Sequence, residues 1–151
     1  MTKPVLFCYD GSEGSRKALT DAAEWINPTD AVVLTVWTPA AIQLARAGSF
    51  IVSIPNEGEV DDEEAASAQH IAEEGAAGAQ GHGFNAIARV AEATESTAKT
   101  IEDVADEIDA GLIVCGQRGR GPVTSALLGS VSHALAAHTQ RPVLIAPQQV
   151  P

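Results

Sequence analysis

The sequence has 151 residues, a length that favours one domain with its own hydrophobic core. Hydrophobic residues make up 45% of the chain, which excludes an intrinsically disordered polymer. The chain has 20 acidic and 9 basic residues and a net charge of −11. This charge argues against binding to nucleic acid or to an anionic membrane, because phosphate groups are bound by basic patches.

No apolar run approaches the length of a membrane helix, and the apolar run before Asp10 is too short for a secretory signal peptide. The two cysteines, Cys8 and Cys115, do not indicate a disulfide scaffold. We therefore expect a cytoplasmic protein that has neither a membrane nor a nucleic acid as partner.

The first part of the chain is typical of a β-α-β unit. Pro4–Tyr9 is an apolar run before the turn signal Asp10-Gly11-Ser12 and is predicted as a buried strand. Ser12 or Ser15 is expected to cap the following helix, which ends at Asn27-Pro28. Ala31–Trp37 is β-branched and apolar and is predicted as a second strand, parallel to the first.

The middle of the chain is harder to assign. Residues 38–60 show no sustained periodicity, so we predict a long loop that acts as a functional lid or a mobile excursion. Asp61–Gln80 is rich in Ala and Glu and is predicted as a helix, although Gly75 and Gly78 each weaken it by about 1 kcal/mol relative to Ala.

Strands and helices continue to alternate in the rest of the chain. The predicted elements are the strand Phe84–Ala91, the helix Thr94–Ala110 with Gly111 as its stop, the strand Leu112–Cys115, the helix Gly129–His138, which could already start at Thr124, and the strand Pro142–Pro147. This alternation predicts a single α/β domain over residues 1–151, Rossmann-like, with a five-stranded parallel sheet and helices on both faces. In such sheets, ligands bind at the carboxyl ends of the strands.

The segment Leu112–Ser130 runs from a strand through a glycine-rich loop to a helix N-terminus. Backbone N–H groups of the loop and the helix dipole favour an anion, and a phosphate chain is the natural ligand. The glycine order does not match the dinucleotide fingerprint, and the segment has no lysine for a Walker A loop. If the first and fourth strands are neighbours, Asp10 and the loop at Gly116 meet in one crevice.

Each of these residues also has a simpler interpretation. Gly116 and Gly119 could serve only as turn formers. Ser130 and Asp10 could be helix N-caps. Arg118 and Arg120 could be solvated loop charges, although two arginines beside a glycine loop in an acidic chain lean towards phosphate binding.

The spacing Gly116-x2-Gly119-x9-Gly129-Ser130 resembles the nucleotide-binding signature of the universal stress protein family, in the UspA-like subgroup that binds ATP. The segments CYDGSEGS, VVLTVW, GQRGRGPVTSALLGSVSHAL and RPVLIAP extend the resemblance over nearly the whole chain. The resemblance implies the strand order 3-2-1-4-5 and ATP as the ligand. A Mg²⁺ ion would accompany ATP and be held mainly by the phosphates.

The resemblance also implies a set of nucleotide contacts: Asp10 beside the adenosine, the backbone of Val36 at the adenine edge, Gly116 beneath the ribose, Gly119, Gly129 and Ser130 at the phosphates, and Ser132 and Arg118 as additional contacts. Members of the family often have a small residue or a proline at the position of Cys8. ATP, AMP and a cyclic nucleotide all remain candidate ligands.

No nucleophile elbow, Ser-His-Asp pattern or metal-ligand cluster is visible, and His133 and His138 lie five residues apart, on different faces of a helix. We therefore expect no catalytic and no metal-ligating residues. The predicted function is nucleotide sensing or sequestration in a stress response. A slow ATPase and a nucleotide-free dimeric adaptor module are the alternatives.

The last strand suggests a protein partner. In the order 3-2-1-4-5, Val143–Ala146 lies at the edge of the sheet, where an apolar strand must be covered or paired. The family resemblance implies antiparallel pairing of two copies there, which gives a homodimer. The alternative is a short edge strand covered by the polar tail.

Overall fold

The computed structural model describes residues 2–48, 53–119 and 128–148. The elements in these ranges are β1 (Val5–Cys8), α1 (Glu13–Trp25), β2 (Asp30–Trp37), α2 (Ala40–Arg46), α3 (Glu57–Gly81), β3 (Asn85–Glu92), α4 (Thr97–Glu107), β4 (Leu112–Gly116), α5 (Ser130–His138) and β5 (Val143–Ala146). The strands form one parallel sheet in the order β3-β2-β1-β4-β5. Both the predicted fold class and the strand order implied by the resemblance are confirmed.

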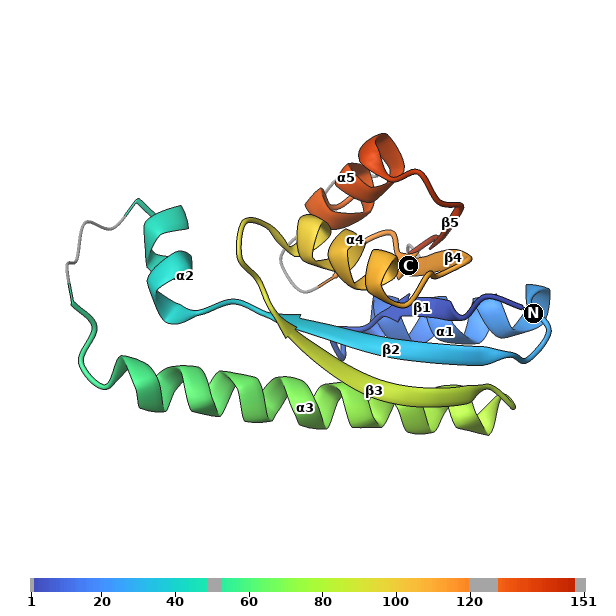
Figure 1. Ribbon diagram of the computed structural model, residues 1–151, viewed down its shortest axis with the longest axis horizontal. Coiled ribbons are helices and arrows are strands. Elements are labelled where there is room, and N and C mark those ends of the chain that lie inside the picture. Colours follow the sequence, from blue (N-terminus) through green and yellow to red (C-terminus); the bar gives the residue numbers. More distant parts are fainter. Residues whose placement is uncertain (1, 49–52, 120–127, 149–151) are drawn as a thin grey trace.

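Helices cover both faces of the sheet, as predicted (Figure 1). α1 and α3 pack on one face, where Leu19 and Ala76 contribute to the core. α4 and α5 pack on the other face, where Ile101 and Leu135 do the same. The sheet is thus the middle layer of three, and its two hydrophobic cores lie on opposite sides.

β1 lies at the centre of the sheet, between β2 and β4. Val5, Leu6 and Phe7 are all buried, because helices cover both faces and successive side chains point to opposite cores. The ring of Phe7 packs edge-to-face on Phe84, with centroids 5.3 Å apart. This burial explains why β1 appears in the sequence as a continuous apolar run.

The segment predicted as a long loop, residues 38–60, contains helical structure, so that prediction is wrong for residues 40–46 and 57–60. α2 has only seven residues, too few to be stable in isolation, and contacts with distant parts of the chain hold it. A carboxylate oxygen of Asp61 accepts a hydrogen bond from the Ala40 N–H (2.9 Å), and Arg46 donates to the Glu95 carbonyl (3.0 Å). Figure 1 shows α2 beyond the end of β2, facing the first turns of α3.

α4 ends at Glu107, three residues earlier than predicted, and the residue that turns the chain is not Gly111. Asp109 has a φ of +49°, in the left-handed region that ends many helices. Its carboxylate pairs with Lys3 at 2.9 Å. The predicted helical start at Thr124 lies outside the described residues, and α5 begins at Ser130.

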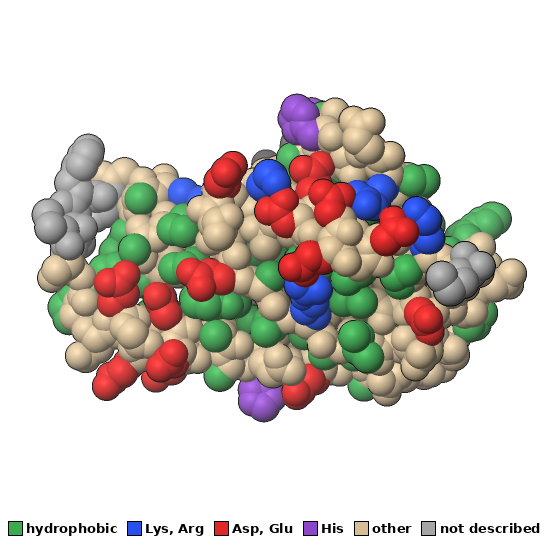
Figure 2. All heavy atoms as spheres, viewed as in Figure 1, with side chains coloured by type: hydrophobic (Ala, Val, Ile, Leu, Met, Phe, Trp, Pro, Cys, Tyr) green, Lys and Arg blue, Asp and Glu red, His purple; other side chains and the backbone are tan. Residues whose placement is uncertain are grey.

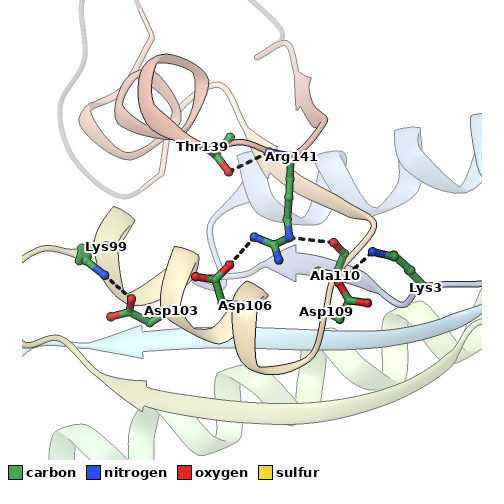
Figure 3. A network of polar contacts seen from close by, with 8 residues as sticks. All are labelled: Lys3, Lys99, Asp103, Asp106, Asp109, Ala110, Thr139 and Arg141. Atoms are coloured by element: carbon green, nitrogen blue, oxygen red, sulfur yellow. Dashed lines mark hydrogen bonds and ion pairs between the residues drawn. The ribbon is translucent and has the colours of Figure 1, made fainter.

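A network of polar contacts joins the turn after α4 to the start of β5 (Figure 3). The guanidinium of Arg141 donates to the Ala110 carbonyl (2.8 Å) and pairs with Asp106 (2.5 Å). The hydroxyl of Thr139 accepts from the Arg141 N–H (3.3 Å). These contacts lie at the amino ends of β4 and β5 and hold the sheet together at the end opposite the candidate site.

The acidic character of the chain is evident on the surface of the first half of α3 (Figure 2). The acidic residues in its first two turns are Glu57, Glu59, Asp61, Asp62, Glu63 and Glu64. Negative charge near a helix N-terminus is favourable, so this run has a structural explanation. None of the helices in residues 2–48, 53–119 and 128–148 combines the length and apolar character that a membrane crossing requires.

α3 approaches the sheet most closely at Gly75. A Cβ atom at this position would lie 2.7 Å from both the Tyr9 ring and a methyl group of Val33. Gly78, one turn later, is exposed, and a Cβ there would meet only Leu19, at 4.0 Å. The two glycines of this helix therefore have different roles.

Gly75→Ala is expected to lower the free energy of unfolding by about 1–3 kcal/mol, because the added methyl overpacks the core. Gly78→Ala, the matched control, is expected to raise it by about 0.5–1 kcal/mol, because alanine favours the helix. Urea denaturation followed by circular dichroism measures both. Shifts of the same sign and size would contradict the assigned packing.

Candidate functional site

A cleft of about 350 Å³ opens at the carboxyl ends of β1, β2 and β4. This volume is within the range of small-molecule sites. β1 and β4 are neighbours, so the segments that follow them come together where the strand order reverses. The described residues that line the cleft are Cys8, Tyr9, Asp10, Ser15, Leu34, Val36, Thr97, Ile101, Cys115, Gly116, Gln117, Arg118, Gly119, Gly129, Ser130, Val131 and Ser132.

Asp10 enters the cleft from the turn after β1. The turn is anchored at Tyr9, whose N–H donates to the Leu34 carbonyl (2.9 Å) and whose carbonyl accepts from the Thr35 hydroxyl (2.7 Å). One carboxylate oxygen of Asp10 accepts a hydrogen bond from the Ser12 N–H (2.9 Å). Ser12, and not Asp10, is the N-cap of α1, so the N-cap interpretation of Asp10 is wrong.

The glycine loop after β4 lies directly against the turn after β1. A Cβ at Gly119 would lie 2.4 Å from the second carboxylate oxygen of Asp10, and one at Gly116 would lie 2.9 Å from the Gly14 carbonyl. Gly14, in the first turn of α1, would have its own Cβ 2.5 Å from the Arg118 carbonyl. Gly14 and Gly116 are thus needed where a Cβ would meet backbone, whereas at Gly119 a Cβ would meet only the end of the Asp10 side chain.

The N-terminus of α5 forms the next wall of the cleft. Gly129 is the N-cap residue and has no side chain to satisfy the first N–H groups of the helix, and Ser130 begins the helix at an exposed position. A Cβ at Gly129 would lie 3.3 Å from the Gln117 carbonyl, so the loop is packed tightly here too. N–H groups without helical partners and the positive end of the dipole suit an anion such as a phosphate.

Ser132 lies in the cleft wall but is 3% exposed. Its hydroxyl donates to the carbonyl of Gln117 (2.8 Å), with the Gly129 carbonyl as a second acceptor at 3.1 Å. Its only proton is therefore engaged within the loop. Ser132 thus fixes the loop on α5, and the additional phosphate contact that the resemblance implied stays a prediction.

The opposite part of the cleft is more apolar. Val36, near the end of β2, lines it together with Leu34 and Ile101. Thr97, at the start of α4, adds a hydroxyl. An apolar wall with a few polar groups suits a planar base better than a phosphate.

Cys8 and Cys115 form part of the floor of the cleft on adjacent strands. Burial raises the pKa of the Cys115 thiol to about 11. Burial, and then the nearness of Cys115 and Asp10, raises the pKa of Cys8 well above its ordinary value. Both thiols are therefore protonated near neutral pH and are poor nucleophiles, as expected of cysteines that act as small apolar residues.

All eight site residues predicted from the sequence, Asp10, Val36, Gly116, Arg118, Gly119, Gly129, Ser130 and Ser132, line this one cleft. Arg120 lies outside the described residues. The described chain shows no group of three His, Cys, Asp or Glu side chains that could hold a metal ion. The contacts of the eight residues with a ligand stay predictions.

The model of the universal stress protein family matches residues 1–147. The chain belongs to this family. Among curated protein sequences, no significant match to this universal stress protein is found.

Solved structures of related proteins have the same fold. Hypothetical protein MJ0577 superposes with a TM-score of 0.79 at 20% identity, covering 100% of this chain and 99% of that one. The universal stress protein of Archaeoglobus fulgidus in complex with dAMP superposes with a TM-score of 0.63 at 21% identity, covering 96% of this chain and 97% of that one. A universal stress protein family protein of Arabidopsis thaliana with AMP bound superposes with a TM-score of 0.65 at 14% identity, covering 98% of this chain and 93% of that one.

Several cleft residues of this universal stress protein were not identified from the sequence. Gln117 holds the loop through its backbone N–H and carbonyl, so its residue type gives no chemical signal. Gly14 lies outside the cleft lining but packs against the loop; its place in the first turn of α1, four residues after Asp10, could have suggested a close approach. Thr97 and Ile101 come from α4, whose place over the cleft only the tertiary structure shows.

Tyr9 anchors the turn from the other face of the sheet. Its hydroxyl donates to a carboxylate oxygen of Glu74 (2.7 Å), and the Arg16 guanidinium donates to the same oxygen (3.0 Å). Burial first, and then the hydrogen bond and charge of Glu74, raise the pKa of Tyr9 to about 12. The residue before Asp10 is thus fixed to both α1 and α3.

Tyr9 is the only tyrosine of the chain, so its ionisation can be followed by absorbance near 295 nm. In the folded protein at about pH 11, Tyr9 is expected to be mostly neutral, whereas an exposed tyrosine would be mostly ionised. The neutral Tyr9 phenol therefore stabilises the folded state. This contribution to the free energy of unfolding is complete below pH 10, the ordinary pKa of tyrosine, and is lost as the pH rises towards 12. The test is a jump to high pH in which the absorbance near 295 nm is recorded before the protein unfolds. Half-ionisation of Tyr9 near pH 10 would contradict the raised pKa.

Glu74→Gln is the companion variant. It removes the carboxylate charge, so the pKa of Tyr9 is expected to fall, while burial keeps it above 10. An unchanged midpoint of the Tyr9 titration would show that Glu74 does not influence the pKa of the phenol.

Proposed function

We propose that this universal stress protein binds an adenine nucleotide in the cleft at the carboxyl ends of β1, β2 and β4. The phosphates lie against Gly119, Gly129 and Ser130 at the N-terminus of α5. The adenine lies towards Val36, and Asp10 lies beside the adenosine. One observation carries the proposal: Asp10 and the glycine loop meet in a single cleft, beside a helix N-terminus.

The residues of the cleft fit the group they would hold. Gly119 and Gly129 both line the cleft, and as glycines they place no side chain between their backbone and a phosphate. The Archaeoglobus and Arabidopsis relatives, solved with dAMP and AMP, support an adenine nucleotide as the class of ligand. ATP with Mg²⁺ extends this proposal, since Mg²⁺ bound to ATP takes most of its ligands from phosphate and water.

The proposed role is sensing or sequestration of the nucleotide in a stress response, in the cytoplasm. Phosphoryl transfer needs a positioned base and several cationic groups around the transferred phosphate. Among the described residues that line the cleft, Asp10 is the only carboxylate and Arg118 the only cation. Asp10 already accepts the Ser12 N–H, which favours a binding role over a catalytic one.

Gly119→Ala tests the site with little risk to the fold. The new methyl would collide with the end of a flexible side chain, Asp10, and not with backbone, so the cost in stability is expected to stay below about 1.5 kcal/mol, the scale of one hydrogen bond. The displaced carboxylate and the filled loop are expected to weaken AMP and ATP binding at least about tenfold, or about 1.4 kcal/mol. Isothermal titration calorimetry with and without Mg²⁺ measures this.

Gly58→Ala is the control, because a Cβ there has no neighbour within 4 Å and Gly58, on α3, is not among the residues that line the cleft. Equal affinities in the wild type and both variants would exclude the proposed site. Phosphate release that survives repurification and disappears in Gly119→Ala would favour the slow ATPase. A wild-type protein that binds no adenine nucleotide would leave the adaptor module as the function.

We further propose that two copies pair through β5. β5 lies at the edge of the sheet, and Val143, Leu144 and Ile145 are only partly buried in the single chain. An edge strand of this composition is stabilised by a partner. Antiparallel pairing of two β5 strands would give a two-fold dimer with a continuous sheet.

Val143→Lys is expected to convert the dimer to a monomer, because a lysine on an edge strand opposes pairing with a second copy. Sedimentation velocity measures the mass, and circular dichroism confirms that the variant is folded. Wild-type protein that sediments as a monomer at about 100 μM would contradict the dimer.

A further inference from the structure

Gln117 makes several of the hydrogen bonds described for the loop after β4. Its N–H donates to the Ala146 carbonyl (2.8 Å), and its carbonyl accepts from the Gly129 N–H (2.8 Å) and the Ser132 hydroxyl (2.8 Å). Its side-chain oxygen accepts from the Gln148 N–H (3.0 Å). One residue thus contacts the end of β5, the N-terminus of α5 and the chain beyond β5.

These contacts differ in what they hold. The two bonds to the Gln117 carbonyl come from the residues that begin α5, so they set the place of the helix N-terminus in the cleft. The side chain instead reaches the segment after Pro147, which lies outside the cleft. A shift of Gln117 would therefore move the helix N-terminus and the segment at Gln148 together.

We propose that Gln117 is a positioning residue that couples the phosphate end of the cleft to the segment after β5. This inference rests on the proposed nucleotide function. A phosphate that binds at Gly129 and Ser130 holds the N-terminus of α5, and thereby Gln117, in place. The Gln117 side chain then holds the Gln148 amide more firmly, and by reciprocity the anchored segment strengthens phosphate binding.

The position of Gln117 makes the coupling specific to phosphate. Val36, Leu34 and Thr97, in the more apolar part of the cleft, belong to β2 and α4. The hydrogen bonds described for Gln117 go to β5, α5 and their flanking residues, at the phosphate end of the cleft. A nucleoside without phosphate would therefore not engage the coupling.

The decisive measurement is the exchange rate of the Gln148 amide hydrogen, followed by NMR with AMP or adenosine as the probe. In the wild type, AMP is expected to slow this exchange several-fold, and adenosine is expected to leave it unchanged. In Gln117→Leu, the acceptor is gone, so the amide is expected to exchange like an unprotected chain with or without AMP.

The second readout is affinity. Gln117→Leu is expected to weaken AMP about threefold to tenfold, the range of one hydrogen bond, and to change adenosine affinity less than twofold. Gln148→Pro removes the same bond from the donor side, because proline has no N–H, and it is expected to reproduce the loss for AMP. Gln69→Leu on α3 is the matched control, since its side chain bonds only Glu73 among the described contacts.

Each result decides the proposal. Loss of affinity for AMP but not adenosine, in both Gln117→Leu and Gln148→Pro, would support it. Equal losses for AMP and adenosine would overturn it, because they would show a general structural role. AMP binding that is the same in the wild type and Gln117→Leu would overturn this inference alone. A wild-type protein that binds no AMP would overturn the proposed function with it.

Discussion

The close contact between the turn after β1 and the loop after β4 is the constraint on which the site depends. Gly119 lies against the Asp10 carboxylate, and Gly14 lies against the Arg118 carbonyl. Two backbone segments can approach this closely only where no Cβ atom intervenes. The contact exists because β1 and β4 pair as parallel neighbours, from Val5 with Leu112 to Phe7 with Val114, and so end at the same edge.

The cleft places the N-terminus of α5 within an acidic chain. The chain has a net charge of −11, yet the cleft is suited to an anion. Backbone N–H groups and a helix N-terminus supply positive potential without requiring a basic surface. Such potential acts on a phosphate at short range. The proposed binding of a nucleotide is therefore compatible with the overall charge.

The supports of the site lie on both sides of the sheet. On one side, Tyr9 connects the turn after β1 to Glu74 and Arg16, and Gly75 lets α3 approach the Tyr9 ring. On the other side, Gln117 and Ser132 hold the loop on α5. The cleft residues are thus held by rigid elements, which limits the entropy that ligand binding must offset.

The sequence by itself determined the parallel α/β class, the main strands and helices, and the positions that converge on the cleft. Hydrophobic runs, turn residues and glycine spacing are local signals, and they appear directly in the order of the amino acids. Only the tertiary structure decided the helix at Ala40–Arg46, the left-handed Asp109, and the roles of Gln117 and Thr97. These features depend on contacts between distant residues and on backbone atoms, which are the same in every residue type, so no local pattern could reveal them.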